Sequence, residues 1–270
     1  MRLKYLKNIP SYINSYKTIS NVRNAYPSPK VLVLGSGCSL RLLEQYPLLT
    51  LKKKLNIQYI FGVNNVCLYD HIDLSLIDDY FICYPLYFVD KVTPSLRSRL
   101  MSGGDFTSSS IDSEISECFS ARYRILENFN GRLWLPHQSE LFCSNTLQSL
   151  LLPYYFSRRS GNTSNPLLPL YGPHSTTSCA IALARAYGAC NIYTLGIDNN
   201  SFTTLDTCSS DYEAHSYSYY YEHAYDISPK KRMHKGTLSD FLFLAYKVNL
   251  TYERYKAIKL TDTLITDLCH

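Results

Sequence analysis

The sequence lacks any long apolar run. No segment reaches the roughly 18 consecutive apolar residues that a membrane-spanning helix needs. Residues 1 to 30 are polar, basic and aromatic, and they contain no apolar core of the kind that defines a signal peptide. We therefore expect a cytoplasmic chain without a membrane span.

The sequence also lacks cysteines at metal-binding or redox spacings. Its nine Cys are odd in number, and no two of them form a C-x-x-C motif. Several stand inside apolar stretches, as Cys179 does in SCAIALA. We expect free, buried thiols in a reducing compartment and no zinc site.

The composition permits one large domain. The chain has 270 residues, of which 46% are hydrophobic, and its net charge of +5 allows an anionic partner without requiring one. Its 25 Tyr suit contacts with polar ring-shaped ligands. Residues 1–29, which end in Pro-Ser-Pro, are expected to form an appended segment that docks on the protein or on a membrane surface. Residues 30–270 are expected to form a single domain.

Strand-like and helix-like stretches alternate along the chain. This alternation predicts an α/β fold with a mostly parallel, Rossmann-like sheet flanked by helices. The expected strands are 31–34, 58–63, 72–77, 132–135, 141–143, 191–195 and 257–260. The expected helices are 39–45, 111–127, 146–156, 175–187 (with Gly188 ending it) and 236–256.

Small and polar residues follow four of the expected strands. These ends are Gly35-Ser36-Gly37, the GVNN of residues 62–65, Asp78-Asp79 and the GIDNN of residues 196–200. Ligands of parallel sheets gather at the carboxyl ends of the strands. The pattern therefore predicts a polar pocket along one edge of the sheet.

The first of these ends favours a phosphate. Gly35 and Gly37 are expected to adopt positive φ and to let backbone N–H groups approach a ligand, ahead of a helix that begins at Ser39. Leu40 replaces the third glycine of G-x-G-x-x-G, and no Gly-Lys-Ser/Thr follows. A nucleotide phosphate is thus favoured over a dinucleotide, and an ordinary strand-to-helix turn is the alternative.

Four segments taken together resemble a known family. VLVLGSGCSL, GVNN, STTSCAIALARAYGACNIYTLGIDNN and RMHKGT occur in the same order as the motifs of bacterial sialyltransferases of the Campylobacter type. The opening G-x-G-x-S-L is also similar to that of the MptE-like group. The resemblance runs from residue 31 to the C-terminus, but its residues are concentrated in these segments.

The resemblance implies a glycosyltransferase with a variant of the GT-A fold and a lid over about 201–235. Such an enzyme moves an acidic sugar, such as sialic acid or Kdo, from a CMP-activated or other nucleotide-activated donor to a glycan hydroxyl. His234 matches the general base. The positions matched to nucleotide-sugar binding are Gly35, Ser36, Gly37, Ser39, Asn64, Asp78, Ser175, Thr176, Thr177, Gly196, Asp198 and Asn200. Three positions depart from the pattern: Ser36 replaces Asn, Cys38 replaces Pro, and Asn200 stands where a phosphate-binding Tyr is expected.

The chemistry of transfer needs a base and a group that neutralises the departing phosphate. A His with a pKa near about 6.5 suits the first task, and Tyr hydroxyls, helix N–H groups or cations can serve the second, so no cofactor is required. His174, His215 and His223 are rivals of His234 as the base. His234 could also be an ordinary exposed His in a charged run.

Two other functions are compatible with the sequence. Asp78, Asp79 and Asp198 could hold Mg²⁺ for an MptE-like pyrophosphokinase that uses ATP, unless the first two simply cap a helix. A nucleotide-binding protein without catalysis is the third reading. The expected partners are the nucleotide-sugar donor, a glycan or glycolipid acceptor, the inner face of the membrane, and a second copy of the chain.

Overall fold

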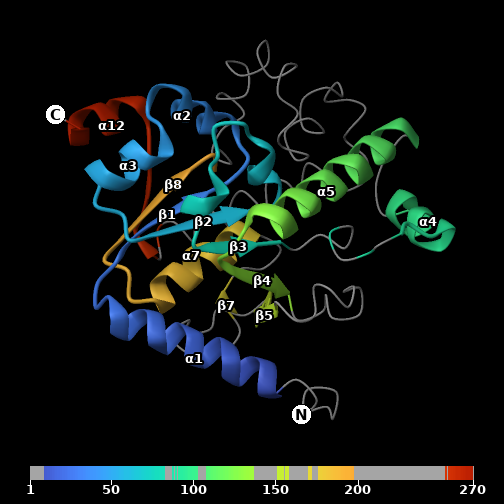
Figure 1. The fold of residues 1–270 in the computed structure, drawn as a ribbon, viewed down its shortest axis with the longest axis horizontal. Coiled ribbons are helices and arrows are strands. Elements are labelled where there is room, and N and C mark those ends of the chain that lie inside the picture. The colour runs from blue at the N-terminus through green and yellow to red at the C-terminus, as the bar shows by residue number, and fades with distance from the viewer. Residues whose placement is uncertain are drawn as a thin grey trace.

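The computed structural model describes residues 9–82, 87, 89, 91–102, 108–136, 151–154, 156–157, 170–171, 176–197, 253 and 255–269. Their centre is a seven-stranded sheet with the strand order β5-β4-β3-β2-β1-β8-β9, in which every neighbouring pair is parallel. A pair of short strands, β6 and β7, forms a second sheet. The fold is thus α/β and Rossmann-like, as predicted (Figure 1).

The elements have the following bounds. The strands are β1 (Lys30–Leu34), β2 (Tyr59–Val63), β3 (Asp79–Phe81), β4 (Arg132–Pro136), β5 (Leu151–Tyr154), β6 (Phe156–Ser157), β7 (Leu170–Tyr171), β8 (Asn191–Leu195) and β9 (Ala257–Lys259). The α-helices are α1 (Ile9–Ala25), α2 (Leu42–Gln45), α3 (Leu48–Lys54), α4 (Pro94–Ser102), α5 (Ser108–Asn128), α7 (Thr176–Ala186) and α12 (Asp262–Cys269). Short 3-10 helices cover Cys38–Arg41, Asn64–Leu68 and Leu74–Leu76.

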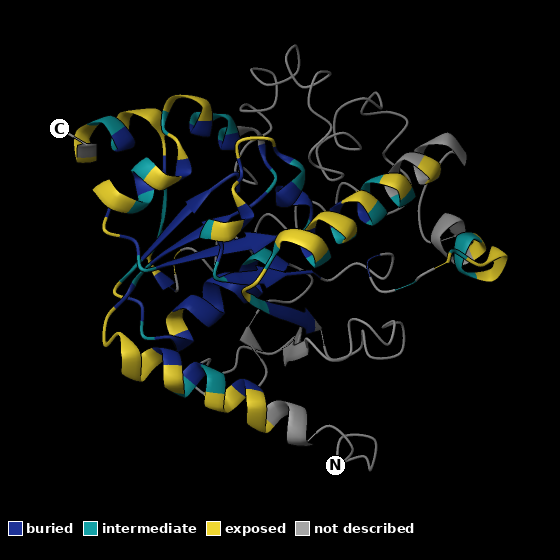
Figure 2. Cartoon of the chain, in the orientation of Figure 1, coloured by how far each residue is buried: buried dark blue, intermediate teal, exposed yellow. Residues whose placement is uncertain are grey.

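The sheet is buried on both faces, because each strand sends alternate side chains to opposite sides. In β1, Leu32 and Leu34 pack into one core with residues of α2, α3, α5 and α12. Val31 and Val33 pack into a second core with residues of α1 and α7. Figure 2 shows the resulting layers, with the buried strands between helices that are exposed on their outer sides.

Helix α1 belongs to the second of these cores. Its Ile19 and Val22 are buried there, while Ile13 and Tyr16 are 41% and 47% exposed. The backbone N–H of Cys190 donates to the carbonyl of Pro29, which ties the end of the segment to the start of β8. Residues 1–29, expected as an appended segment, therefore contribute a helix that is packed on the domain.

Helix α7 begins and ends where its sequence predicts. The N–H of Gly188 donates to the carbonyl of Arg185, and the N–H of Ala189 donates to that of Ala184. With a φ of +86° at Gly188, these bonds form a Schellman motif, which satisfies the last carbonyls of the helix. The predicted ending at Gly188 is confirmed.

Two predicted elements are wrong. Residues 74–76 of the expected strand 72–77 form a 3-10 helix, and the strand comes later, at Asp79–Phe81. Residues 151–154 of the expected helix 146–156 form strand β5. Helix 111–127 is confirmed within α5, although Tyr123, expected on its buried face, is 63% exposed. The expected strand 141–143 and most of the expected helix 236–256 lie outside the described residues.

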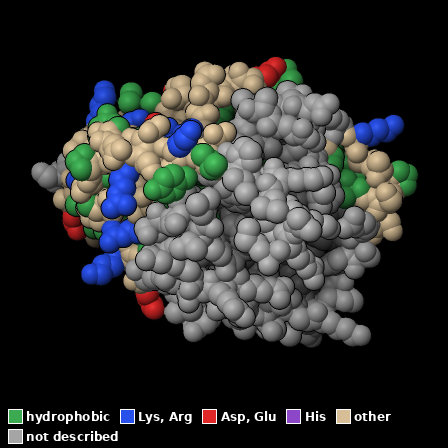
Figure 3. All heavy atoms as spheres, turned by 90° about the horizontal axis from the view of Figure 1, so that it is seen from below, with side chains coloured by type: hydrophobic (Ala, Val, Ile, Leu, Met, Phe, Trp, Pro, Cys, Tyr) green, Lys and Arg blue, Asp and Glu red, His purple; other side chains and the backbone are tan. Residues whose placement is uncertain are grey.

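Figure 3, a view from below, shows Lys and Arg side chains mainly toward one end of this face. Within the part of the chain that the structure describes, no helix is both long and apolar enough to cross a membrane.

Candidate functional site

The direction of the strand order reverses at β1. From β1 the sheet continues through β2 and β3 on one side and through β8 and β9 on the other. In open parallel sheets the crevice outside the carboxyl ends of the strands at such a switch point is where ligands bind. The candidate site therefore lies where β1 and β8 end, at the first and last of the four predicted strand ends.

The ends of β1 and β8 are bonded directly to each other. The N–H of Gly35 donates to the carbonyl of Leu195 at 2.8 Å, and the N–H of Gly37 donates to that of Gly196 at 2.7 Å. The N–H of Gly196 donates to the hydroxyl of Ser39 at 2.9 Å. The structure thus brings together Gly35, Gly37, Ser39 and Gly196, although more than 150 residues separate the first three from the last.

These bonds correct the predicted role of the first two glycines. Gly37 has a φ of −84°, and Gly35 is not among the described glycines with positive φ, so the expected left-handed turn at these positions is wrong. Gly196, at φ +70°, adopts that conformation instead. Because the N–H groups of Gly35 and Gly37 already have partners, they cannot also hold a phosphate; Ser36 and Ser39, both half-buried, remain at this edge.

Glycine is needed here because the two loops touch. A Cβ atom on Gly35 would overlap the carbonyl oxygen of Gly196 and would lie 2.8 Å from Cγ1 of Ile197. A Cβ atom on Gly196 would overlap the carbonyl of Gly35 in return. The two glycines therefore shape the floor of the switch point by close backbone packing.

Asn64 follows β2 at the same edge of the sheet. Leu34 pairs with Gly62, so Asn64 lies just beyond the paired ends of β1 and β2, whose strands are about 4.8 Å apart. Its φ is +52°, a left-handed conformation that Asn tolerates better than most residues. It is half-buried, whereas every other residue from 59 to 67 is buried.

Asn65, the next residue, has a structural role. It is 5% exposed, its side-chain oxygen accepts a hydrogen bond from the hydroxyl of Tyr87, and its amide nitrogen donates to Glu117 of α5 at 3.3 Å. The second Asn of GVNN thus attaches the turn to α5. Of the two, Asn64 is the half-buried one.

The beginning of α7 lies toward this edge. The last turn of α7 leads through residues 187–190 into the start of β8, so the first turn lies toward the opposite ends of the strands. Thr176 is buried and Thr177 is half-buried. The other predicted site residues, Ser175, Asp198, Asn200 and His234, and the rival bases His174, His215 and His223 lie outside the described residues. So does the predicted lid, 201–235.

Asp78 and Asp79 do not belong to this edge. They precede and begin β3 rather than ending a strand, and Asp79 pairs in register with Arg132 at the start of β4. They therefore lie toward the amino ends of the strands, away from Gly35, Asn64 and Gly196. The predicted nucleotide-side position of Asp78 is wrong.

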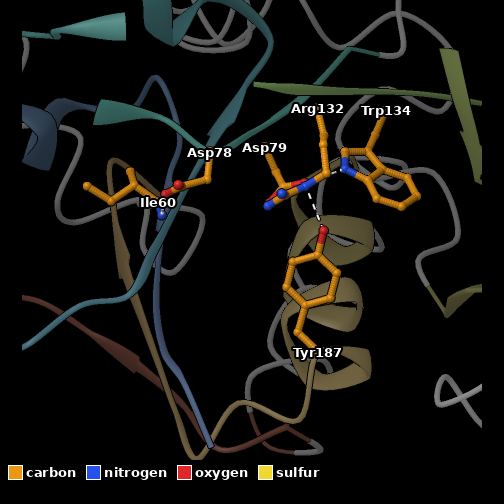
Figure 4. A network of polar contacts seen from close by, with 6 residues as sticks. All are labelled: Ile60, Asp78, Asp79, Arg132, Trp134 and Tyr187. Carbon is orange, nitrogen blue, oxygen red and sulfur yellow. Dashed lines mark hydrogen bonds and ion pairs between the residues drawn. The ribbon is translucent and has the colours of Figure 1, made fainter. Parts of the chain in front are cut away.

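The Asp79 carboxylate is instead the centre of a buried network (Figure 4). Asp79 is 0% exposed; Arg132 donates to it through Nε and Nη2, each at 2.7 Å, and Nε1 of Trp134 donates at 2.7 Å. The hydroxyl of Tyr187, at the end of α7, donates at 2.9 Å. Four donors satisfy one carboxylate, so it is engaged within the protein and is a poor ligand for a metal.

The electrostatics of the network follow from burial and pairing. Burial alone lowers the pKa of Arg132, but the hydrogen bonds and charge of Asp79 outweigh it and raise that pKa above its usual value. The Arg132 guanidinium also lies 5.6 Å from the ring centre of Tyr59 and 5.7 Å from that of Tyr187. The Arg132 guanidinium is therefore held in its charged form.

Asp78 caps the backbone of a strand, not a helix. Its carboxylate accepts a hydrogen bond from the N–H of Ile60 at 2.8 Å, and its own N–H donates to the carbonyl of Ile60. Burial raises its pKa, which the N–H of Ile60 and the charge of Lys52 only partly oppose. The carboxylate of Asp78 thus bonds the backbone of β2 and that of Asp79 bonds side chains of β4 and of Tyr187 at the end of α7, so neither caps a helix.

Sequence reasoning missed one residue of the edge, Tyr80 of β3. It is fully buried, and its hydroxyl donates to the carbonyl of Asn64 at 2.5 Å and accepts from the N–H of Cys67 at 3.0 Å. The local sequence, in which Tyr80 follows two Asp, shows only an aromatic residue in an apolar stretch. The contact with Asn64 depends on the pairing of β2 with β3, which no local pattern reveals.

No cluster of three or more His, Cys, Asp or Glu side chains that could hold a metal occurs among the described residues. Burial raises the pKa of the Cys67 thiol to about 12, so this thiol is a poor nucleophile.

Comparisons of the chain with protein-family models, with curated proteins and with solved structures give no match.

Proposed function

We propose that the protein is a glycosyltransferase that uses a nucleotide-activated sugar as its donor. The donor is an acidic sugar such as sialic acid or Kdo, carried by CMP or another nucleotide, and the acceptor is a glycan hydroxyl. The proposal rests on the family resemblance of the sequence. It is supported by the position of the segments that carry that resemblance.

The observation that carries the proposal is the meeting of three of these segments at one switch point. Gly35–Ser39 and Gly196 are joined by hydrogen bonds, and Asn64 lies on the neighbouring strand end. Residues that the sequence resemblance links to one ligand are thus neighbours in the fold.

The predicted site residues that the structure describes at this edge are polar or glycine, and none of them is charged. Ser36, Ser39 and Asn64 are half-buried and supply hydroxyl and carboxamide groups, which suit the hydroxyls of a ribose or a sugar. Because the amides of Gly35 and Gly37 are already bonded, the phosphate must be held by other groups. The Tyr-rich and Lys/Arg-rich stretch of residues 212–235 supplies them in the proposal, and His234 is the general base.

The pyrophosphokinase alternative loses its main argument. It needed Asp78 and Asp79 at the ligand edge to hold Mg²⁺, whereas Asp79 is bonded to Arg132, Trp134 and Tyr187. Asp198 alone of the three is left for a metal under this reading. Magnesium dependence therefore serves as an outcome of the test rather than as part of the proposal.

We also propose that the enzyme works against a membrane surface that carries its glycolipid acceptor. The part of α1 that faces away from the core exposes Ile13, Tyr16 and Lys17, and Tyr26 is 50% exposed just beyond it. Helices that lie in a membrane interface combine basic residues with aromatic and aliphatic ones, and such interfaces attract basic residues when they carry anionic lipid. Vesicle flotation with and without anionic lipid tests this contact.

The function is tested by a thermal-shift panel followed by kinetics. CMP, UDP, GDP and ATP are added with and without Mg²⁺, because a ligand that binds only the folded state raises the unfolding temperature. We expect stabilisation by CMP without Mg²⁺. Stabilisation by ATP only with Mg²⁺ would favour the pyrophosphokinase, and stabilisation without any turnover of CMP-sialic acid or CMP-Kdo would favour a binding protein.

The general base is tested by comparing two histidines. His234→Ala should lower kcat for sugar transfer by about 10²–10⁴-fold and leave nucleotide affinity nearly unchanged. His174→Ala is the matched comparison, because His174 lies just before α7. If His174→Ala lowers kcat and His234→Ala does not, the base is His174 and the resemblance fails at its C-terminal motif.

A further inference from the structure

Tyr80 links β3 to the turn that follows β2. Its side chain is fully buried, and its hydroxyl makes two hydrogen bonds, donating to the carbonyl of Asn64 at 2.5 Å and accepting from the N–H of Cys67 at 3.0 Å. One hydroxyl thus bridges the first and fourth residues of the turn. A buried hydroxyl that both donates and accepts is held in one orientation.

The ring of Tyr80 is held as firmly as its hydroxyl. A Cβ atom on Gly62 would lie 2.7 Å from Cε2 and 2.8 Å from Cδ2 of this ring, so the glycine of GVNN leaves the space that the ring occupies. The ring of Tyr80 also packs edge to face against that of Phe129, with the two ring centres 5.6 Å apart. Residue 62, the first of GVNN, is therefore glycine because the ring of Tyr80 occupies the space that a larger side chain would need.

The turn held in this way has an unusual backbone conformation. Asn64 has a φ of +52°, and residues other than glycine adopt such values at a cost in free energy. Such a conformation persists where the surrounding structure fixes it. The hydrogen bonds of Tyr80 on both sides of the turn supply that constraint.

The turn also presents Asn64 at the ligand edge. Asn64 is half-buried, while residues 59–63 before it and 65–67 after it are buried. In this stretch a ligand at the switch point can therefore reach Asn64 alone. The neighbouring end of β1 contributes Ser36, which is also half-buried.

We propose that Tyr80 is a positioning residue that fixes the left-handed turn at Asn64, so that Asn64 binds the nucleotide or sugar hydroxyls of the donor. This inference rests on the proposed function. It adds a residue of β3 that the family resemblance does not point to. Tyr80 itself is buried and acts through Asn64.

Tyr80→Phe removes the hydroxyl and keeps the ring against Gly62. We expect the amide of Cys67 to exchange with solvent at least about tenfold faster, because it loses its hydrogen-bond acceptor. We expect the Kd of the nucleotide that the wild type binds most tightly among CMP, UDP and GDP to rise about tenfold. Both are measured on the full chain, by hydrogen exchange and by calorimetry.

Tyr187→Phe is the matched control. Tyr187 is also a fully buried Tyr whose hydroxyl donates a hydrogen bond, but its acceptor, Asp79, lies toward the amino ends of the strands. This variant should lower the unfolding temperature and leave the nucleotide Kd unchanged. An equal rise of Kd in both variants would mean a general loss of stability and would overturn the inference.

The remaining outcomes separate the inference from the proposed function. If the wild type binds a nucleotide and Tyr80→Phe binds it equally well, Tyr80 is not a positioning residue although the function stands. If the wild type binds none of the three nucleotides, the proposed function and this inference fall together. If Tyr80→Phe does not fold, the Asn64→Ala variant is measured instead. We expect its nucleotide Kd to rise about tenfold, while the amide of Cys67 exchanges no faster than in the wild type. An unchanged Kd in Asn64→Ala would overturn the inference.

Discussion

Gly35 and Gly196 lie backbone against backbone where β1 and β8 end, so close that a Cβ atom on either would overlap the carbonyl oxygen of the other. The N–H of Gly37 completes the contact by donating to Gly196. The main role of the glycine-rich turn in the fold is therefore to pack the end of β1 against the end of β8. A ligand at the switch point would lie on this contact rather than inside the turn.

Gly35→Ala should lower the free energy of unfolding by about 3 kcal/mol, the upper end of what overpacking usually costs, because the obstacle is backbone that cannot rotate away. Gly188→Ala is the control. There the nearest atom to a new Cβ is 3.6 Å away, and only the φ of +86° opposes alanine, at about 1 kcal/mol. Urea unfolding of both variants checks the order; equal losses would contradict the close contact at Gly35.

Arg132→Met should destabilise the protein by about 3–5 kcal/mol, because it leaves the carboxylate of Asp79 buried without its cation. Arg97→Met is the control, since Arg97 pairs with Asp112 at 2.6 Å on the surface, where an ion pair contributes little. Its unfolding midpoint should stay close to that of the wild type. A small effect of Arg132→Met would contradict the account of Arg132 as the essential partner of the buried Asp79 carboxylate.

Asp78→Asn should change how stability depends on pH. Burial raises the pKa of Asp78 in the folded state above its unfolded value, so ionisation opposes folding: stability is fully present below the unfolded pKa and is lost as pH rises through the folded pKa. Asn keeps an oxygen for the N–H of Ile60 and does not ionise. We expect the unfolding midpoint of the variant to rise relative to that of the wild type as the pH is raised from about 4 to 7. A fall of the variant's midpoint relative to the wild type over this range would contradict the prediction.

Ile19→Ala in α1 should lower the free energy of unfolding by about 2–5 kcal/mol, because Ile19 is 3% exposed and its loss leaves a cavity under the helix. Ile13→Ala is the matched substitution on the same helix, at 41% exposure. It should leave stability nearly unchanged and, under the membrane proposal, should weaken vesicle binding. Equal stability of the two variants would mean that α1 does not contribute to the core.

The parallel sheet could be predicted because its strands are short apolar runs followed by turn residues. Val31–Leu34 and 59–63 are wholly buried, and such runs show where a strand is without the aid of neighbours. The position of Gly35, Asn64 and Gly196 just after strands could be predicted as well, whereas the strand order, and with it the switch point at β1, comes from the structure alone. The torsions of the turn could not be predicted, because glycine at residue 35 is required by contact with Gly196, which is 161 residues away, rather than by its own φ.

The error at Asp78 and Asp79 has a physical reason. The stretch IDLSLIDDYFICY contains two apolar runs, on either side of the Asp pair, and local pattern alone cannot tell which is the strand. The second apolar run is the strand, because Asp79 can be buried at the start of β3. Its donors Arg132 and Tyr187 lie 53 and 108 residues away in sequence. The donors that make burial of the Asp79 carboxylate possible are therefore distant in sequence and invisible to a local pattern. The same holds for the hydrogen bond from Tyr80 to Asn64.

Hydrogen exchange of the full chain with and without saturating CMP tests the central claim most directly. A nucleotide at the switch point should slow amide exchange in residues 35–42 and 62–68 and around Gly196, and it should leave residues 26–30 and 77–79, toward the amino ends of the strands, unchanged. Slower exchange confined to the amino ends of the strands, or no change in any segment, would contradict the account of this edge as a nucleotide-sugar site.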